Sequence, residues 1–150
     1  MRPPRIYADT SVVGGCFDEE FAESSLALMG MARRGRLILL LSDILADELA
    51  PAPAEVQEFF AALSGRFVET VLSSDESEQL RDAYLKAGVV GRAQERDAHH
   101  IALATIVRAD LMVSWNFKHI VHYDRIRMFN AVNMRLGYPL VEIRTPREVV

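Results

Sequence analysis

The stretch DAHHIALATIVRADLMVSWNFKH, residues 97–119, decides the fold that we predict for this chain. It begins with a carboxylate, Asp97, on an apolar segment of helical period, turns at Ala109-Asp110, and continues into a short apolar strand at 111–113. A cluster of polar residues follows that strand: Ser114, Asn116, Lys118 and His119. In an open α/β sheet, ligands bind outside the carboxyl ends of parallel strands. We therefore predict a site where this strand ends.

Two acids near the ends of predicted elements are candidates for that site, and each also has a purely structural explanation. Asp97 in the first turn of a helix would offset the positive end of the helix dipole. Asp9 ends a predicted strand at 5–9 and is followed by Thr10 and Ser11, a run that can equally cap a following helix.

A third acid, Glu48, lies four residues after Ile44 on a predicted helix and so shares its apolar face. A carboxylate in such a place is costly unless it is paired or bound. Asp43 and Asp47 are predicted to face solvent by comparison.

Strands and helices alternate along the whole chain. The predicted strands are 5–9, 36–42, 67–71, 111–113 and 140–143. The predicted helices are 19–34, 44–50, 55–63, one from 73–76 to Gly88, 97–108 and 123–136. The continuous apolar run at 36–42 is typical of a strand buried on both faces of a parallel sheet. This order predicts an α/β fold, a helix–sheet–helix sandwich with a mainly parallel sheet, formed by residues 1–150 as one domain.

Composition limits the class of protein. Half of the 150 residues are hydrophobic, which is enough to build a core without disulfides. The single cysteine, Cys16, cannot form an internal disulfide, and we expect it to be a small, partly buried residue. No apolar run approaches the length of a membrane span. We therefore expect a soluble cytoplasmic protein without a targeting segment.

The net charge of −4 argues against a generally adhesive nucleic-acid binder, but the charge is unevenly distributed. Residues 1–84 hold 7 Lys and Arg against 15 Asp and Glu, whereas residues 85–150 hold 10 against 6. The second part could face a polyanion. Alternatively, the charges interleave on the folded surface.

Convergence of Asp9, Glu48 and Asp97 would place three carboxylates together without basic partners. Such carboxylates repel one another, and a hard divalent cation bound through oxygen resolves the repulsion. Magnesium or manganese is the expected occupant, and it can activate water and clamp phosphate oxygens for phosphodiester hydrolysis.

The chain resembles the PIN domain family, especially the VapC-type toxins of bacterial toxin–antitoxin pairs. The resemblance rests on four motifs in this order and covers nearly the whole chain: Asp9-Thr10-Ser11, Glu48, the run DAHHIALA at 97–104, and VSWNF at 113–117. It implies a PIN-like α/β/α sandwich and a metal-dependent ribonuclease, usually dimeric and neutralised by an antitoxin. It also implies that Asp9, Glu48 and Asp97 are the acidic metal-site residues, with Ser11 and Ser114 as supporting hydroxyls.

One position departs from the family pattern. The family's common fourth acid falls at Asn116, which can coordinate through its carbonyl oxygen but brings no charge. A second cation would be held less strongly, and His119 then becomes a candidate contact for phosphate. We retain Asn116 as a site residue.

The histidines raise zinc as a competing interpretation, because His119 and His122 are three apart and His99 or His100 could join them. It is disfavoured, since no cysteine is near and adjacent histidines diverge on a helix. Trp115 could stack on a base, although a large aromatic after a strand is more often a packing residue. The candidates for holding RNA phosphates, each of which could equally be a solvated surface residue, are Lys118, Arg96, Arg92 and Arg125.

We therefore predict an endoribonuclease that uses Mg²⁺ or Mn²⁺, acts on RNA, and is the toxin of a toxin–antitoxin pair. The alternative is a catalytically weakened PIN-like domain that binds RNA or a protein without cutting, which Asn116 favours. A phosphatase of another α/β family would need a second acid in a DxD motif, which Asp9-Thr10-Ser11 lacks.

Overall fold

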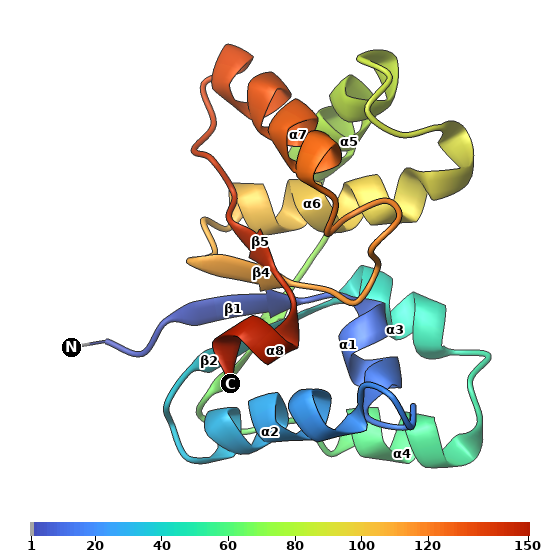
Figure 1. Cartoon of the computed structure of the whole chain (residues 1–150), viewed down its shortest axis with the longest axis vertical. Coiled ribbons are helices and arrows are strands. Elements are labelled where there is room, and N and C mark those ends of the chain that lie inside the picture. The colour runs from blue at the N-terminus through green and yellow to red at the C-terminus, as the bar shows by residue number, and fades with distance from the viewer. Residues whose placement is uncertain (1) are drawn as a thin grey trace.

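The computed structural model describes residues 2–150, and at its centre is a sheet of five strands (Figure 1). The strands lie in the order β3-β2-β1-β4-β5, and every neighbouring pair is parallel. Their bounds are Arg5–Ala8 for β1, Ile38–Ser42 for β2, Val68–Val71 for β3, Leu111–Val113 for β4 and Ile143–Arg144 for β5. The first strand is therefore central, and the carboxyl ends of β2, β1 and β4 meet at one edge of the sheet.

Helices cover both faces of the sheet (Figure 1). One layer contains α5 (Asp75–Lys86), α6 (Glu95–Ile106), which follows the 3₁₀ turn η1 (Arg92–Gln94), and α7 (Tyr123–Arg135). The other contains α1 (Thr10–Gly15), α2 (Ala22–Arg33), α4 (Ala54–Ala61) and α8 (Pro146–Val149). Helix α3 (Asp43–Leu49) contacts both α1 and α6, so it lies between the layers. Across residues 2–150, no helix has the length and apolar character needed to cross a bilayer.

Two apolar cores, one on each face of the sheet, hold the layers together. Tyr7 belongs to the core under α5, α6 and α7, whereas its neighbours Ile6 and Ala8 belong to the opposite core. Leu40 and Leu39 of β2 divide between the two cores in the same way. Alternate side chains of a strand point to opposite faces. A strand covered on both faces must therefore be apolar at every position, which explains the continuous apolar run of β2.

The α/β class and the parallel sheet are confirmed, and most predicted elements are observed within a few residues of their predicted ends. The predicted strand at 140–143 is wrong in position, because residues 140–142 form no strand and β5 is Ile143–Arg144. Helix α6 begins at Glu95, so Asp97 is its third residue rather than its first.

Two short helices, α1 and α8, were not predicted, because neither is long enough to show a helical period. The prediction that Asp43 faces solvent is also wrong. Its carboxylate is half-buried and accepts hydrogen bonds from the Ser73 backbone N–H at 3.0 Å and the Ser73 hydroxyl at 2.6 Å. Asp47 is exposed, as predicted.

Candidate active site

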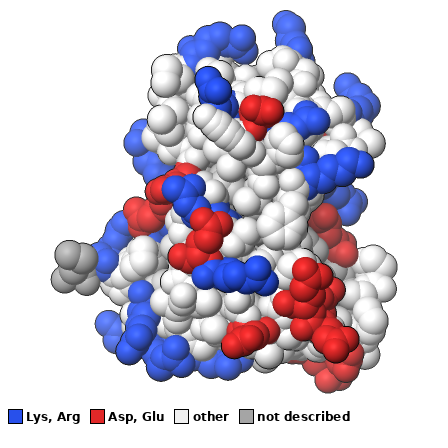
Figure 2. All heavy atoms as spheres, viewed as in Figure 1, with Lys and Arg blue, Asp and Glu red and all other residues white. Residues whose placement is uncertain are grey.

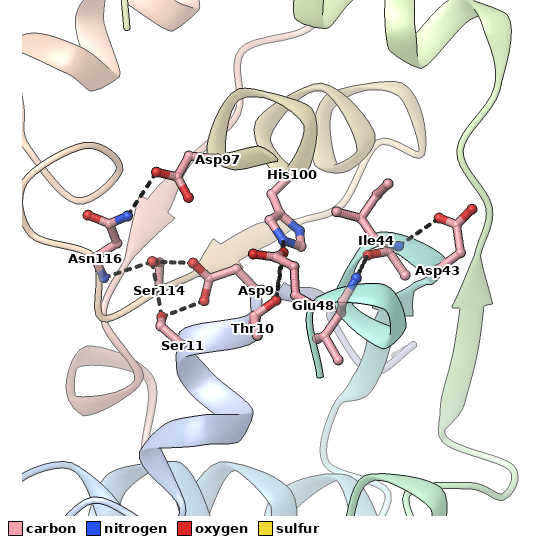
Figure 3. Close-up of polar contacts among 12 residues, drawn as sticks. Asp9, Thr10, Ser11, Asp43, Ile44, Glu48, Asp97, His100, Ser114 and Asn116 are labelled. Carbon is pink, nitrogen blue, oxygen red and sulfur yellow. Dashed lines mark hydrogen bonds and ion pairs between the residues drawn. The ribbon is translucent and has the colours of Figure 1, made fainter. Parts of the chain in front are cut away.

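Asp9 lies at the carboxyl end of β1 and immediately before α1. It occupies the N-cap position of that helix, but its side chain makes no capping hydrogen bond. Instead, its two oxygens accept hydrogen bonds from two serines: Oδ1 from Ser11 Oγ at 2.6 Å and Oδ2 from Ser114 Oγ at 2.6 Å (Figure 3). The helix-capping explanation of Asp9 is therefore wrong. Only 3% of Asp9 is exposed, so the carboxylate is buried between the ends of two neighbouring strands.

The same two serines fix the segment that follows β4. Ser11 Oγ accepts a hydrogen bond from the backbone N–H of Trp115 at 2.8 Å, and Ser114 Oγ accepts one from that of Asn116 at 2.9 Å. Each hydroxyl thus donates to Asp9 and accepts from the chain. This pairing holds Asp9 and the 114–116 segment in one arrangement.

Asn116 reaches from this segment to Asp97 on α6. Its Oδ1 accepts a hydrogen bond from the backbone N–H of His119 at 3.0 Å, and its Nδ2 donates to Asp97 Oδ2 at 3.2 Å (Figure 3). Because a backbone N–H can only donate, it fixes which end of the amide faces it. Asn116 therefore presents its NH₂ group to Asp97, whereas its carbonyl oxygen, the predicted ligand atom, is bonded to the chain.

The pKa values of Asp9 and Asp97 both lie above the ordinary range of aspartate. Burial raises the pKa of Asp9, against the opposing effects of His100 and the two serine hydroxyls. Burial also raises the pKa of Asp97, and the negative charge of Asp9 raises it further, followed by that of Glu48. Within residues 2–150, neither aspartate forms an ion pair with lysine or arginine. The negative charge of Asp9 and Asp97 is therefore not balanced by an ion pair with lysine or arginine in this part of the chain.

Glu48 lies beside this pair but has its own partners. Its Oε1 accepts hydrogen bonds from Thr10 Oγ1 at 2.9 Å and from His100 Nε2 at 2.6 Å (Figure 3). Burial alone would raise the pKa of Glu48, but the hydrogen bond and charge of His100, with smaller effects of Thr10 and Arg96, hold that pKa below its usual value. Glu48 is therefore ionised at neutral pH, and its Oε1 is held by two hydrogen bonds.

His100 is the site residue that the sequence reasoning missed. It is 1% exposed, and its Nδ1 lies 2.6 Å from the hydroxyl of Tyr7. The sequence offers His99 and His100 only as candidates for a disfavoured zinc site, whereas the structure buries both. One signal was available, since a residue three positions after Asp97 lies on the same face of a helix.

The histidines do not gather around one point. His99 Nε2 pairs with Ser77 Oγ at 2.9 Å, away from the Glu48 contact of His100. His119 Nδ1 is buried without a hydrogen-bond partner. Within the described residues 2–150, no three His, Cys, Asp or Glu side chains are grouped closely enough to hold a metal ion.

The predicted phosphate-binding residues differ in solvent exposure and in whether their side chains already form hydrogen bonds. Arg92 and Arg96 are exposed and, with Glu48 and Asp97, line a cavity of about 320 Å³ beside the site. Lys118 is also exposed, whereas Arg125 is half-buried and donates to the backbone carbonyl of Val89. Arg125 is therefore a poorer candidate than the other three.

Trp115 is a packing residue. It is 5% exposed, its ring stacks on Phe21 with centroids 4.3 Å apart, and its Nε1 donates to Ser25 Oγ at 2.8 Å. A buried ring of this kind cannot receive a base.

Comparisons with known proteins bear on the fold. No family model matches the sequence, and no curated protein matches it. The fold is similar to that of a chain in the crystal structure of VapBC2 from Rickettsia felis bound to a DNA fragment from their promoter. The likeness has a TM-score of 0.57 at 13% identity and covers 94% of this chain and 98% of that chain. With its five-stranded parallel sheet between two helical layers, the chain is an α/β protein with a PIN-like fold.

Proposed function

We propose that this chain is a metal-dependent endoribonuclease that hydrolyses RNA phosphodiester bonds at the site formed by Asp9, Asp97 and Glu48. The observation that carries the proposal is the pair of buried Asp9 and half-buried Asp97, whose negative charge has no lysine or arginine ion pair among residues 2–150. Asp9 at the carboxyl end of β1 and Asp97 in the first turn of α6 form an uncompensated pair of carboxylates, which is a natural binding place for a divalent cation.

The donor chemistry of the site fits Mg²⁺ or Mn²⁺. These ions prefer oxygen ligands, and each oxygen of Asp9 accepts a single hydroxyl and so keeps a free lone pair. Among residues 2–150 the three carboxylates are not grouped as a finished metal site, so Asp97 and Glu48 would have to move toward Asp9 to complete the set around a cation. A bound cation of this kind activates water and stabilises charge on phosphate oxygens.

The chain's own residues orient these groups. Ser11 and Ser114 fix the Asp9 carboxylate, and Asn116 fixes Asp97 through its NH₂ group. Arg92 and Arg96 line the cavity beside Glu48 and Asp97, and the exposed Lys118 follows Asn116 by two residues, which supports all three as candidates for holding RNA phosphates. His119, with its buried and unpartnered Nδ1, is a weaker candidate for a phosphate contact than these exposed cations.

We extend the proposal to the biological setting. The motif resemblance to VapC-type toxins, together with the PIN-like fold, supports a cytoplasmic toxin that forms a homodimer and is neutralised by an antitoxin.

A second candidate function is favoured by Asn116. Where the family pattern has a carboxylate, this side chain presents hydrogen-bond donors to Asp97. A site with one fewer charge binds cations more weakly, so the domain could bind RNA or a protein without cutting.

The test is cleavage of a mixed single-stranded RNA pool by purified protein, free of antitoxin, with Mg²⁺, Mn²⁺ or EDTA. We expect cleavage that requires the cation and is lost in Asp9→Asn and Asp97→Asn, which keep the size of the side chains. Asp124→Asn, an exposed aspartate on α7, is the matched control and should cleave like the wild type. RNA binding without cleavage in any of these conditions would favour the second candidate.

A further inference from the structure

His100 is a buried histidine with both ring nitrogens engaged. It lies one turn after Asp97 on α6, with Nε2 2.6 Å from Glu48 Oε1 and Nδ1 2.6 Å from the hydroxyl of Tyr7. A carboxylate oxygen can only accept, so Nε2 carries the proton of the first bond. Burying an imidazole is unfavourable unless its nitrogens are satisfied, and here both are.

Tyr7 anchors this histidine to the centre of the sheet. Tyr7 is fully buried in β1, and its hydroxyl also lies within hydrogen-bond distance of Ser42 Oγ, 3.0 Å away at the end of β2. Ser42 in turn caps α3 by accepting the backbone N–H of Leu45 at 3.1 Å. The histidine ring is therefore held by Tyr7 from the sheet and by Glu48 from α3.

The hydrogen bond from His100 restricts the conformation of the Glu48 side chain. Its side chain is 22% exposed, and an unrestrained glutamate there would adopt several rotamers. Because Thr10 and His100 both bind Oε1, the carboxylate is fixed by one oxygen and Oε2 is left over. Figure 3 shows this second oxygen on the side of Glu48 that faces Asp9.

We propose that His100 is a positioning residue that holds Oε1 of Glu48, so that Oε2 is presented to the cation centre of Asp9 and Asp97, and that Tyr7 holds His100 in turn. This inference deepens the proposed function and rests on it. Outer partners of metal-binding carboxylates typically change metal affinity or activity by about 10- to 100-fold when they are removed.

The test compares two amide substitutions that separate the two contacts of the ring. The His100→Gln side chain reaches about as far as Nε2 and can still donate to Glu48. The shorter His100→Asn side chain reaches about as far as Nδ1 and keeps only the Tyr7 contact. Mn²⁺ binding is measured by electron paramagnetic resonance without RNA, alongside thermal unfolding in EDTA and kcat and KM for RNA cleavage.

We expect His100→Asn to weaken Mn²⁺ binding by about tenfold or more and to lower kcat with little change in KM, whereas His100→Gln stays within about threefold of the wild type. A purely structural role for His100 would lower the Tm of both variants and leave the Mn²⁺ affinity of the folded protein unchanged. Equal Mn²⁺ binding by His100→Asn and wild type, or equal losses in both variants, would overturn the inference.

If His100→Asn does not fold, Tyr7→Phe tests the inference instead. This substitution keeps the imidazole of His100 and its contact with Glu48, but removes the hydroxyl that holds His100. Weaker Mn²⁺ binding by Tyr7→Phe supports the inference, and unchanged binding contradicts it. The two proposals fail differently. Wild-type protein that binds Mn²⁺ but does not cut RNA contradicts the nuclease and leaves the His100 comparison decisive, whereas wild-type protein that binds no Mn²⁺ refutes both.

Discussion

At the scale of single residues, the contact between Asn116 and Asp97 determines how much negative charge the site holds. Asn116 donates to Asp97 at 3.2 Å and is itself oriented by the backbone N–H of His119. A carboxylate in its place could still accept from His119, but its other oxygen would face Asp97 with like charge. Asn116 therefore avoids repulsion of Asp97 and, under the proposed function, would weaken the attraction of the site for a cation.

Asn116→Asp should make the protein depend more on a cation. In EDTA at neutral pH we expect a lower Tm than the wild type, because two carboxylates then face each other. In Mn²⁺ we expect the loss to be regained, because a ligand that binds only the folded state stabilises it. Thermal unfolding with EDTA and with Mn²⁺ measures both effects. Gln79→Glu, the same change of charge at an exposed position of α5, should show neither, and a cation-independent Tm for Asn116→Asp would contradict this account.

The raised pKa of Asp97 gives stability a defined dependence on pH. Burial and the charge of Asp9 make the folded protein bind this proton more tightly than the unfolded chain does. The resulting stabilisation is fully present below the unfolded-state pKa, about 3.9 for aspartate, and is lost as the pH rises through the raised folded-state value. Glu48 acts in the opposite sense, since its pKa is lowered.

Asp97→Asn should therefore raise the Tm of the cation-free protein at pH 7–8. We expect a gain of about 2–4 °C, which corresponds to about 1 kcal/mol in a chain of this size. The gain should shrink with falling pH and vanish below about pH 4. Thermal unfolding in EDTA between pH 4 and 8 checks this, with Asp124→Asn as the control. A variant less stable than the wild type at pH 8 would show that the repulsion does not destabilise the fold.

The sequence indicated some residues of the site and not others, for physical reasons. Asp9, Asp97 and Ser114 were predicted because they sit at the ends of apolar elements, and parallel strands bring such ends together. His100 was missed because its role depends on two partners 93 and 52 positions away along the chain, Tyr7 and Glu48. The spacing of His100 from Asp97 indicates a shared helix face, but no local pattern reports the contacts with Tyr7 and Glu48.

At the scale of elements, the fold was predictable where a segment was long and covered on both faces. The strands at 36–42 and 111–113 were predicted because burial demands uninterrupted apolar residues there. The short helix α1 was not, although it positions both Thr10 and Ser11. The last strand is only two residues long, and the three residues before it mimic a strand by composition.

Helix α1 packs closely on the segment after β4, and one glycine permits it. A Cβ on Gly15 would lie 2.7 Å from Ser25 Oγ and 2.8 Å from Trp115 Nε1, the two atoms that are hydrogen-bonded to each other. Because Trp115 follows Ser114 directly, this contact also supports the serine that holds Asp9.

Gly15→Ala should destabilise the protein by about 1–3 kcal/mol, the usual effect of overpacking a tight contact. Gly14→Ala is the matched control in the same helix, because nothing lies within 4 Å of its added Cβ. That substitution should be neutral or slightly stabilising, since alanine favours a helix over glycine. Urea unfolding of both variants measures the difference, and equal midpoints would show that the helix shifts to accommodate the methyl group.

At the scale of the whole molecule, the charge asymmetry of the sequence survives folding. Figure 2 shows lysine and arginine side chains over the upper helical layer, which contains α5, α6 and α7, and a dense group of acidic side chains at the lower right. Basic residues also lie at the lower left, so the two layers are not uniformly charged. The asymmetry persists because the chain builds most of the lower layer before residue 84 and most of the upper layer after it.

This distribution predicts where RNA phosphates bind. Arg96 is exposed and lines the same cavity as Glu48 and Asp97, so Arg96→Ala should weaken RNA binding and reduce its salt dependence. One lost phosphate contact lowers the slope of log K against log[salt] by about 0.7 for a single strand. Fluorescence anisotropy with Asp9→Asn as the background measures binding without cleavage at several salt concentrations. Arg135→Ala, which removes the same charge from an exposed position in the last turn of α7, is the control and should change neither quantity. Equal slopes for both variants would mean that RNA enters the site from another side, with Lys118 as the next residue to substitute.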